Sequence, residues 1–424
     1  MNKKTLILIL IVVILIGGGL GYYFFTARKT QTQVPANNPG EFAFGNQVNN
    51  GGAGVAVSTP SPIPFTDISS STLAVNQNAS SLQKLQPVSI NSSNIIIAMT
   101  GGVVFDNGTS TILRYMERGT GHIFERTFGS STPIGPAKEI SNTTIPRIQE
   151  TLWIPEGDSL LARYVKDNSD EIDTFYGKLT IATSSESEPG SVDGNFLDTN
   201  INNLAEGGKD KIFSLENTGE QATGIISNPD GRKQNIVFKS PLAEWLPQWP
   251  KEGTVALTTK ASQDAPGFLF FLNTANGNLK KILAEINGLT TLTNPDTSYI
   301  LYSESTDRGF TLNTFNVKTG DANLTPIQTL PEKCVWSKKD TATAWCLVPK
   351  FQIPAHYPDD WYQGKILFSD DIWKINVKTG ESELLLAINN GIIIDGIKLF
   401  TNSTENMLFF TNKKNMTLWS FDLR

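Results

Sequence analysis

The residues best suited to binding or catalysis lie close together between Pro349 and Asp371. This stretch combines aromatic rings, which supply rigid contact area, with carboxylates, which accept hydrogen bonds or bind a hard cation. A structural role stays open for the same residues, because the rings could pack over an edge of the fold while the carboxylates cap turns. The candidate binding residues are Tyr357, Asp359, Asp360, Trp361, Tyr362, Asp370 and Asp371.

Side chains for other kinds of chemistry are scarce. The 424 residues include only two histidines, His122 and His356, and the sequence has no G-x-S-x-G elbow, P-loop, dinucleotide fingerprint, H-E-x-x-H motif or EF-hand loop. We therefore expect no catalytic residue, no metal site and no cofactor. An enzyme would need paired carboxylates from acidic residues such as Asp359, Asp360, Asp370 and Asp371, and this alternative stays open.

Composition and charge narrow the range of partners. The chain is 39% hydrophobic, which is enough for a large core, and 35 Lys and Arg against 41 Asp and Glu give a net charge of −6. No basic block occurs after residue 29. Nucleic acid, which is bound through clustered positive charge, is therefore not an expected partner.

A strand–turn–strand pattern repeats along the chain. Its turn ends in glycine, which supplies the positive φ of a tight hairpin, and residues 316–320 and 376–380 are the same five-residue string. Earlier in each unit, an aromatic residue, a polar turn and a short apolar strand form another hairpin, as after Trp153 and Trp249. Two hairpins per unit of roughly 45 residues make a four-stranded blade of a β-propeller. The expected turn glycines are Gly121, Gly177, Gly231, Gly277, Gly320 and Gly380.

This repeat resembles that of the TolB-type, or PD40 (WD40-like), propeller family, whose unit has a tryptophan, a Ser-Pro-Asp-Gly-like turn, an apolar strand and an Asp-x-x-Thr-Gly turn. The resemblance covers most of residues 95–424 and implies architecture rather than function, because these residues build blades. Thr293 and Phe400 replace the tryptophan, and blade three, between Asn200 and Pro241, has no clear first hairpin. We predict an all-β propeller with seven four-stranded blades, with six or eight as alternatives.

The ends of the repeat region predict how the ring closes. Residues 418–424 align with residues 372–378, and the sequence stops where the next turn should begin. The last blade would then lack its outer strand and expose an unpaired edge, which β-proteins avoid. Residues 81–86 resemble a strand that follows a glycine turn, so we predict that they pair with residues 418–423. The interval of 60 residues from Gly320 to Gly380 is long because residues 349–371 interrupt blade six.

The two cysteines are placed to meet across a hairpin. Cys334 and Cys346 each lie six positions from Asp340, so they face one another if the turn centres there. An oxidising compartment would then allow a disulfide, and two buried thiols are the alternative.

The N-terminal region predicts a membrane anchor and a linker. Residues 5–25 carry no charge and are long enough to span a bilayer. We predict an uncleaved signal-anchor within residues 1–29, a disordered Pro/Gly/Asn-rich linker at 30–80 and a propeller at 81–424, with a cleaved signal peptide as the alternative. The protein would cross the cell membrane once, with its N-terminus cytoplasmic and its propeller outside the cytoplasm. A linker of about 50 residues reaches on the order of 40 Å.

Two functions fit these features. The first is a non-enzymatic module of the cell envelope that binds a protein or a glycan through one propeller face. The alternative is an envelope hydrolase or lyase that uses the acidic residues of the blade-six stretch. Two of those carboxylates converging in a pocket with opposed pKa shifts would favour the enzyme, whereas scattered carboxylates would favour binding.

Overall fold

The computed structural model describes residues 81–85 and 98–424, apart from residues 109, 130–135, 167–170, 182–188, 199, 209, 218, 220 and 390. The predicted anchor at 5–25 and linker at 30–80 lie outside the described residues. Among the residues that are described, no helix combines the length and the apolar character needed to cross a membrane.

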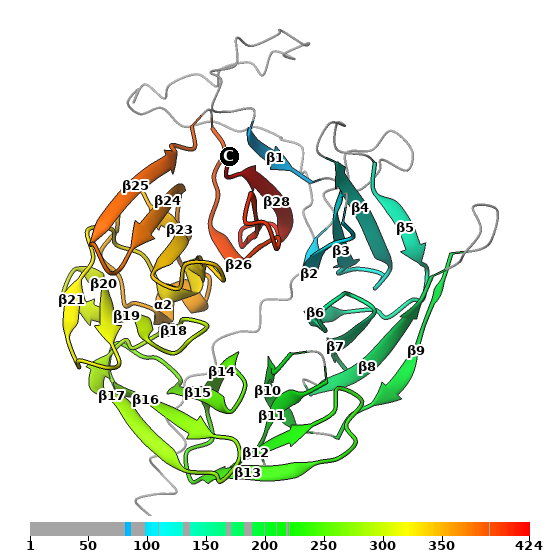
Figure 1. Ribbon diagram of the computed structural model, residues 1–424, viewed down its shortest axis with the longest axis horizontal. Coiled ribbons are helices and arrows are strands. Elements are labelled where there is room, and N and C mark those ends of the chain that lie inside the picture. The colour runs from blue at the N-terminus through cyan, green and yellow to red at the C-terminus, as the bar shows by residue number, and fades with distance from the viewer. Residues whose placement is uncertain are drawn as a thin grey trace, which may run out of the picture. The chain divides into compact units, whose positions relative to one another are not determined.

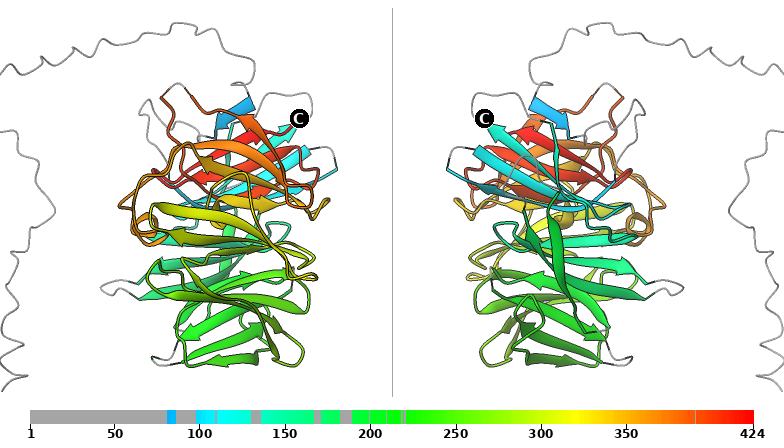
Figure 2. Two further views of the ribbon diagram at one scale, coloured as in Figure 1. Left: turned by 90° about the vertical axis from the view of Figure 1, so that its left-hand side faces the viewer. Right: turned by 90° about the vertical axis from the view of Figure 1, so that its right-hand side faces the viewer.

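Seven antiparallel sheets of four strands each follow one another around a ring (Figure 1). Their strands run across the thickness of the ring (Figure 2). Blades one to three consist of β2 (Met99–Asp106), β3 (Ser110–Glu117), β4 (Ile123–Gly129) and β5 (Lys138–Ser141); β6 (Ile148–Trp153), β7 (Ser159–Val165), β8 (Ile172–Thr180) and β9 (Ser191–Phe196); and β10 (Ile201–Glu206), β11 (Ile212–Asn217), β12 (Ala222–Ser227) and β13 (Asn235–Ser240).

Blades four to six have the same order from the centre of the ring outward. They consist of β14 (Trp245–Lys251), β15 (Thr254–Thr259), β16 (Pro266–Asn273) and β17 (Leu279–Asn287); β18 (Thr291–Thr293), β19 (Tyr299–Thr306), β20 (Gly309–Asn316) and β21 (Ala322–Leu324); and β22 (Cys334–Trp336), β23 (Thr343–Pro349), β24 (Asp370–Asn376) and β25 (Glu381–Leu386). The described residues also include two short helices, the 3₁₀ helix η2 (Pro331–Lys333) and α2 (Asp359–Tyr362).

Blade seven joins the two ends of the propeller. It contains β26 (Gly396–Thr401), β27 (Met407–Asn412) and β28 (Thr417–Asp422), and its outer strand is β1 (Leu82–Lys84). Leu82 lies opposite Phe421 and Lys84 opposite Trp419. The predictions of seven blades and of closure by the N-terminal strand are therefore confirmed.

The core lies between neighbouring blades, because each sheet is covered on both faces. Strand β23 shows this most clearly, since all seven of its residues are buried. In blades two and six the tryptophan of the repeat ties the blade to the previous one: the Trp153 indole donates to the Gly101 carbonyl oxygen at 3.3 Å, and that of Trp336 to the Leu292 carbonyl oxygen at 3.0 Å. The repeated residues are therefore ones that fill or anchor the interface between neighbouring blades.

Three details of the repeat differ from the sequence prediction. Gly177 lies inside β8, where a Cβ atom would come within 2.4 Å of a Val192 methyl group, so close packing rather than a turn requires the glycine. Gly121 has a φ of +81° but joins the second and third strands of blade one, not the third and fourth. Blade three does have a first hairpin, between β10 and β11, which turns at Gly207 and Gly208.

The cysteines occupy opposite positions in blade six. Cys334 of β22 lies directly across from Cys346 of β23, and their sulfur atoms are bonded. Both residues are buried at the interface with blade five. The hairpin between them turns close to Asp340, whose side chain accepts a hydrogen bond from Thr343 at 2.7 Å.

Candidate functional site

The stretch that interrupts blade six forms an insertion, residues 350–369, between β23 and β24. Antiparallel strands alternate in direction, so the connections from second to third strand and from one blade to the next lie on the same face of the ring. We call this the insertion face. The described chain begins on the other face, because Leu82 pairs with Phe421 near the far end of β28.

The insertion reaches from blade six across blade five. The Gln352 side chain makes two 3.0 Å hydrogen bonds with the backbone of Phe310 in β20. The Ser305 hydroxyl, at the end of β19, donates to the Tyr357 carbonyl oxygen at 2.5 Å. These bonds hold the insertion on blade five, over the hairpin between β19 and β20.

The insertion also contacts blade four. The Gln263 backbone N–H donates to the Asp359 carboxylate at 2.8 Å, and the Gln263 side-chain oxygen accepts from the Tyr357 backbone N–H at 3.0 Å. Asp359 therefore fastens the start of α2 to the loop between β15 and β16.

The underside of the insertion is an apolar cluster. Tyr357, Trp361 and Phe368 are buried against Phe310 of blade five and Leu330 of the connection from blade five to blade six. The Tyr357 ring meets the Phe310 ring edge-on at 4.8 Å and stacks on Phe368 at 5.8 Å. Burial of these rings gives the insertion a fixed position, and it leaves Tyr362 as the exposed aromatic among the predicted binding residues.

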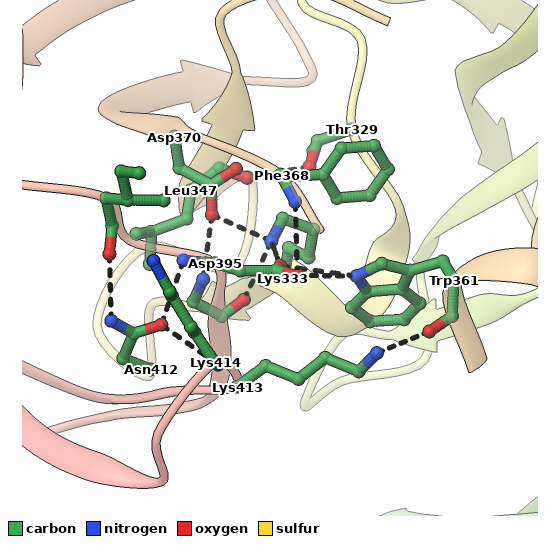
Figure 3. Close-up of polar contacts among 12 residues, drawn as sticks. Thr329, Lys333, Leu347, Trp361, Phe368, Asp370, Asp395, Asn412, Lys413 and Lys414 are labelled. Carbon is green, nitrogen blue, oxygen red and sulfur yellow. Dashed lines mark hydrogen bonds and ion pairs between the residues drawn. The ribbon is translucent and has the colours of Figure 1, made fainter. Parts of the chain in front are cut away.

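A buried group of charges lies beneath this cluster (Figure 3). Lys333 Nζ is 2.7 Å from Asp370 Oδ2 and 2.6 Å from Asp395 Oδ1, and all three side chains are inaccessible to solvent. The ammonium group also donates to the Gly396 carbonyl oxygen at 3.0 Å. Lysine at the end of η2, aspartate at the start of β24 and aspartate just before β26 thus join blades six and seven.

Burial sets the electrostatics of Asp370. Desolvation raises the pKa of its carboxyl from 3.8 to about 6, and the opposing attraction of Lys333 only partly offsets this. Asp370 Oδ2 accepts from Lys333 and from the Gly396 backbone N–H, while its buried Oδ1 has no hydrogen-bond partner among the described residues. The ion pair of Asp370 with Lys333 is therefore a structural contact that no substrate can reach.

The insertion is tied to this group of charges through Trp361. Its indole N–H donates to Asp395 Oδ2 at 2.9 Å, and the Phe368 backbone N–H donates to the same oxygen at 3.2 Å. Lys413 Nζ lies 4.7 Å from the centre of the indole ring and donates to the Trp361 carbonyl oxygen. Burial lowers the pKa of Lys413; the attraction of Asp395 opposes this effect, and the repulsion of Lys333 adds to it.

A second polar contact holds the exposed side of α2. The Tyr362 hydroxyl donates to the Glu332 carboxylate, whose other oxygen accepts from the Thr290 hydroxyl at 2.9 Å. Desolvation raises the pKa of Glu332, and desolvation together with the Glu332 charge raises that of Tyr362. The tyrosine therefore stays protonated and serves as a hydrogen-bond donor.

The remaining predicted residues lie apart. Asp360 accepts from the His356 backbone N–H and from Lys365, both at 2.9 Å, and the Lys365 hydrogen bond contributes most to lowering the pKa of its carboxyl. Asp371 accepts from the Ile388 backbone N–H at 2.8 Å. The carboxylate that meets Asp370 is instead Asp395, for which no motif in the sequence predicts a role. Across the described part of the chain, no three His, Cys, Asp or Glu side chains group as metal ligands.

The outer side of the insertion face carries exposed apolar side chains. Hydrogen bonds from Lys350 N to Ser369 O and from Asp370 N to Ile394 O, both 2.9 Å, bring the base of the insertion beside the connection from β25 to β26. Phe351 is 66% exposed and Ile393 is 46% exposed. We define the apolar patch as Phe351, Ile353, Tyr362, Leu367, Ile392 and Ile393. Large apolar side chains exposed together are typical of interaction sites.

Comparisons with known proteins give remote likenesses. No family model and no curated protein matches the sequence. The oligogalacturonate lyase of Vibrio parahaemolyticus is 11% identical with a TM-score of 0.47, over 78% of this chain and 99% of that one. The β-propeller domain of the Trilobed protease from Pyrococcus furiosus is 9% identical with a TM-score of 0.47, over 78% and 97% of the two chains.

TolB from Acinetobacter baumannii is 9% identical with a TM-score of 0.38, over 77% of this chain and 63% of that chain. Similarity at this level says nothing about activity. The strand pairing itself defines the class of protein: a seven-bladed β-propeller of four-stranded blades, closed by its N-terminal strand.

Proposed function

We propose that this propeller is tethered to the cell membrane by residues 5–25, lies outside the cytoplasm, and binds a partner at the cell envelope without catalysis. Its repeats would be of the TolB, or PD40, type. Of the two partners that the sequence allows, a protein or a glycan, we propose a protein. The observation that carries this choice is the apolar patch, because aliphatic side chains suit a protein interface better than a polyhydroxylated sugar.

The acidic residues offer little support for the enzymatic alternative. Asp370 meets a second carboxylate only in the buried contact with Lys333, where no substrate can enter. Asp359, Asp360 and Asp371 each hold a different backbone N–H group and do not form a pair. Such scattered carboxylates are what a binding module is expected to have.

Site-specific photo-crosslinking in the full chain tests the proposal. A photoreactive amino acid replaces Phe351 or Leu367 in cells that express the protein, and adducts are identified by mass spectrometry. The matched control is Leu324, which is 64% exposed on outer strand β21. We expect the same protein adduct from both patch positions and its absence from position 324. No adduct, or equal adducts from all three positions, would contradict binding through the patch.

The tether is tested separately. The full chain should stay with the membrane after alkaline extraction, and protease added from outside should digest the propeller. A chain lacking residues 1–29 should be soluble. Recovery of the full chain in the soluble fraction would show that residues 5–25 do not anchor it.

A further inference from the structure

We infer that the partner brings carboxylate groups next to apolar side chains, and that Lys413 and Lys414 receive those carboxylates at the edge of the apolar patch. This inference rests on the proposed function and names the chemistry of the partner.

Both lysines adjoin the patch. They follow Asn412, whose side-chain amide donates to the Ile393 carbonyl oxygen at 2.9 Å. Lys413 lies against Trp361 (Figure 3). The Trp361 ring centre is 5.5 Å from that of Tyr362. The connection from β27 to β28 therefore places two positive charges beside apolar residues of both segments that form the patch.

Neither lysine has the close ion pair that other lysines of the insertion face have. Lys350 pairs with Asp371 at 3.3 Å, and Lys365 pairs with Asp360 at 2.9 Å. No described carboxylate lies within ion-pair distance of Lys413 or Lys414: the Lys413 ammonium contacts a carbonyl oxygen and a ring, and Lys414 is exposed. A carboxylate from a partner would give each ammonium group a close ion pair.

The setting of Lys413 makes such a contact worth more than an ordinary surface ion pair. Its ammonium group is half-buried, and partial desolvation disfavours its charge, an effect that the attraction of Asp395 opposes and the repulsion of Lys333 supports. An incoming carboxylate would meet an ammonium group that has lost part of its water, so the contact would be stronger than one between fully exposed groups. Charge pairs of this kind select partners and raise association rates.

An anionic membrane surface is the other source of negative charge beside apolar groups. The direction of the chain favours a protein, because the described propeller begins at Leu82 on the face opposite the insertion. The insertion face therefore points away from the place where the chain enters the ring. Lipid contact is an outcome that the experiment below distinguishes.

The test combines the crosslinker at position 351 with charge reversal. The double variant K413E/K414E should lower the yield of the protein adduct at least about tenfold, the effect expected from replacing a favourable charge contact by repulsion. The control K374E/K378E makes the same change in net charge at exposed positions of blade six and should leave the yield unchanged. With the unaltered lysines, the yield should fall as salt is raised.

The single variant K414E separates an effect on binding from an effect on folding. Lys414 is exposed and its side chain forms no hydrogen bond or ion pair with the described residues, so K414E should fold normally and still lower the adduct yield. Equal yields for the unaltered chain and K413E/K414E would overturn the inference while leaving the proposed function in place. Equal losses in both double variants would also overturn it. A lipid adduct, or none, would overturn the inference and the proposed function together.

Discussion

The Trp361 indole N–H donates a hydrogen bond to Asp395, 2.9 Å away and 34 positions later in the sequence. Trp361 belongs to the insertion of blade six, whereas Asp395 precedes the first strand of blade seven. The same aspartate accepts from Lys333 at 2.6 Å. One carboxylate thus fastens the insertion to two blades, which explains how twenty inserted residues keep a fixed position on a ring of sheets.

Lys333 should be essential for stability. K333M removes the charge that compensates Asp370 and Asp395 and leaves both carboxylates buried without an ion pair. We expect the free energy of unfolding to fall by about 3–5 kcal/mol, the usual cost of removing one partner from a buried pair. Urea unfolding followed by tryptophan fluorescence measures it. K365M, which alters an exposed pair, is the matched control and should change stability little.

Asp370 should make stability depend on pH in a direction opposite to that of an ordinary paired aspartate. Its folded-state pKa of about 6 exceeds the value of about 3.9 expected in the unfolded chain. Between these values the folded protein binds more protons, so the free energy of unfolding gains a favourable contribution as pH falls through 6. D370N lacks this contribution.

Urea unfolding of both proteins at pH 7 and pH 4.5 checks this expectation. The stability of the unaltered protein relative to D370N should be greater at pH 4.5. A relative stability that falls on acidification would show that Lys333 holds the pKa of Asp370 below its ordinary value.

The contrast between ring and insertion shows what a sequence can predict. Blade number and closure follow from turns and strands that recur locally, as in the identical strings at 316–320 and 376–380. Gly177 was misread because glycine marks both turns and close packing within strands, and here Val192 occupies the space of a side chain.

No such local pattern in the sequence predicts the buried charges of Lys333, Asp370 and Asp395. Lys333 and Asp395 are 62 positions apart and belong to no repeated motif. A lysine next to a proline and a glutamate is typical of a surface turn, so only the three-dimensional meeting of two blade connections shows that it is buried. Asp370 was selected as a candidate for binding, but its partner could not be identified from spacing.

The bond between Cys334 and Cys346 predicts the outcome of thiol labelling. Protein unfolded without reductant should react at no thiol, and reduced protein should react at two. The closed loop is short, so the double variant C334A/C346A should lose about 2–4 kcal/mol of stability. Two reactive thiols in the unreduced protein isolated from its native compartment would contradict both the bond and the placement outside the cytoplasm.

The last prediction concerns the strand that closes the ring. Residues 82–84 cover the edge of β28, and Leu85 is buried with Leu113, Phe409 and Leu418 between blades one and seven. A chain lacking residues 1–90 should therefore melt at a markedly lower temperature and self-associate through the exposed edge. A chain lacking residues 1–65 keeps this strand and should melt close to the full-length propeller. In the chain lacking residues 1–65, L85A should lower the free energy of unfolding by about 2–5 kcal/mol, as expected for truncation of a buried leucine. L324A, on an exposed strand, should lower it little. Calorimetry of the two truncated proteins decides the matter, because equal melting temperatures would mean that the ring is stable without its N-terminal strand.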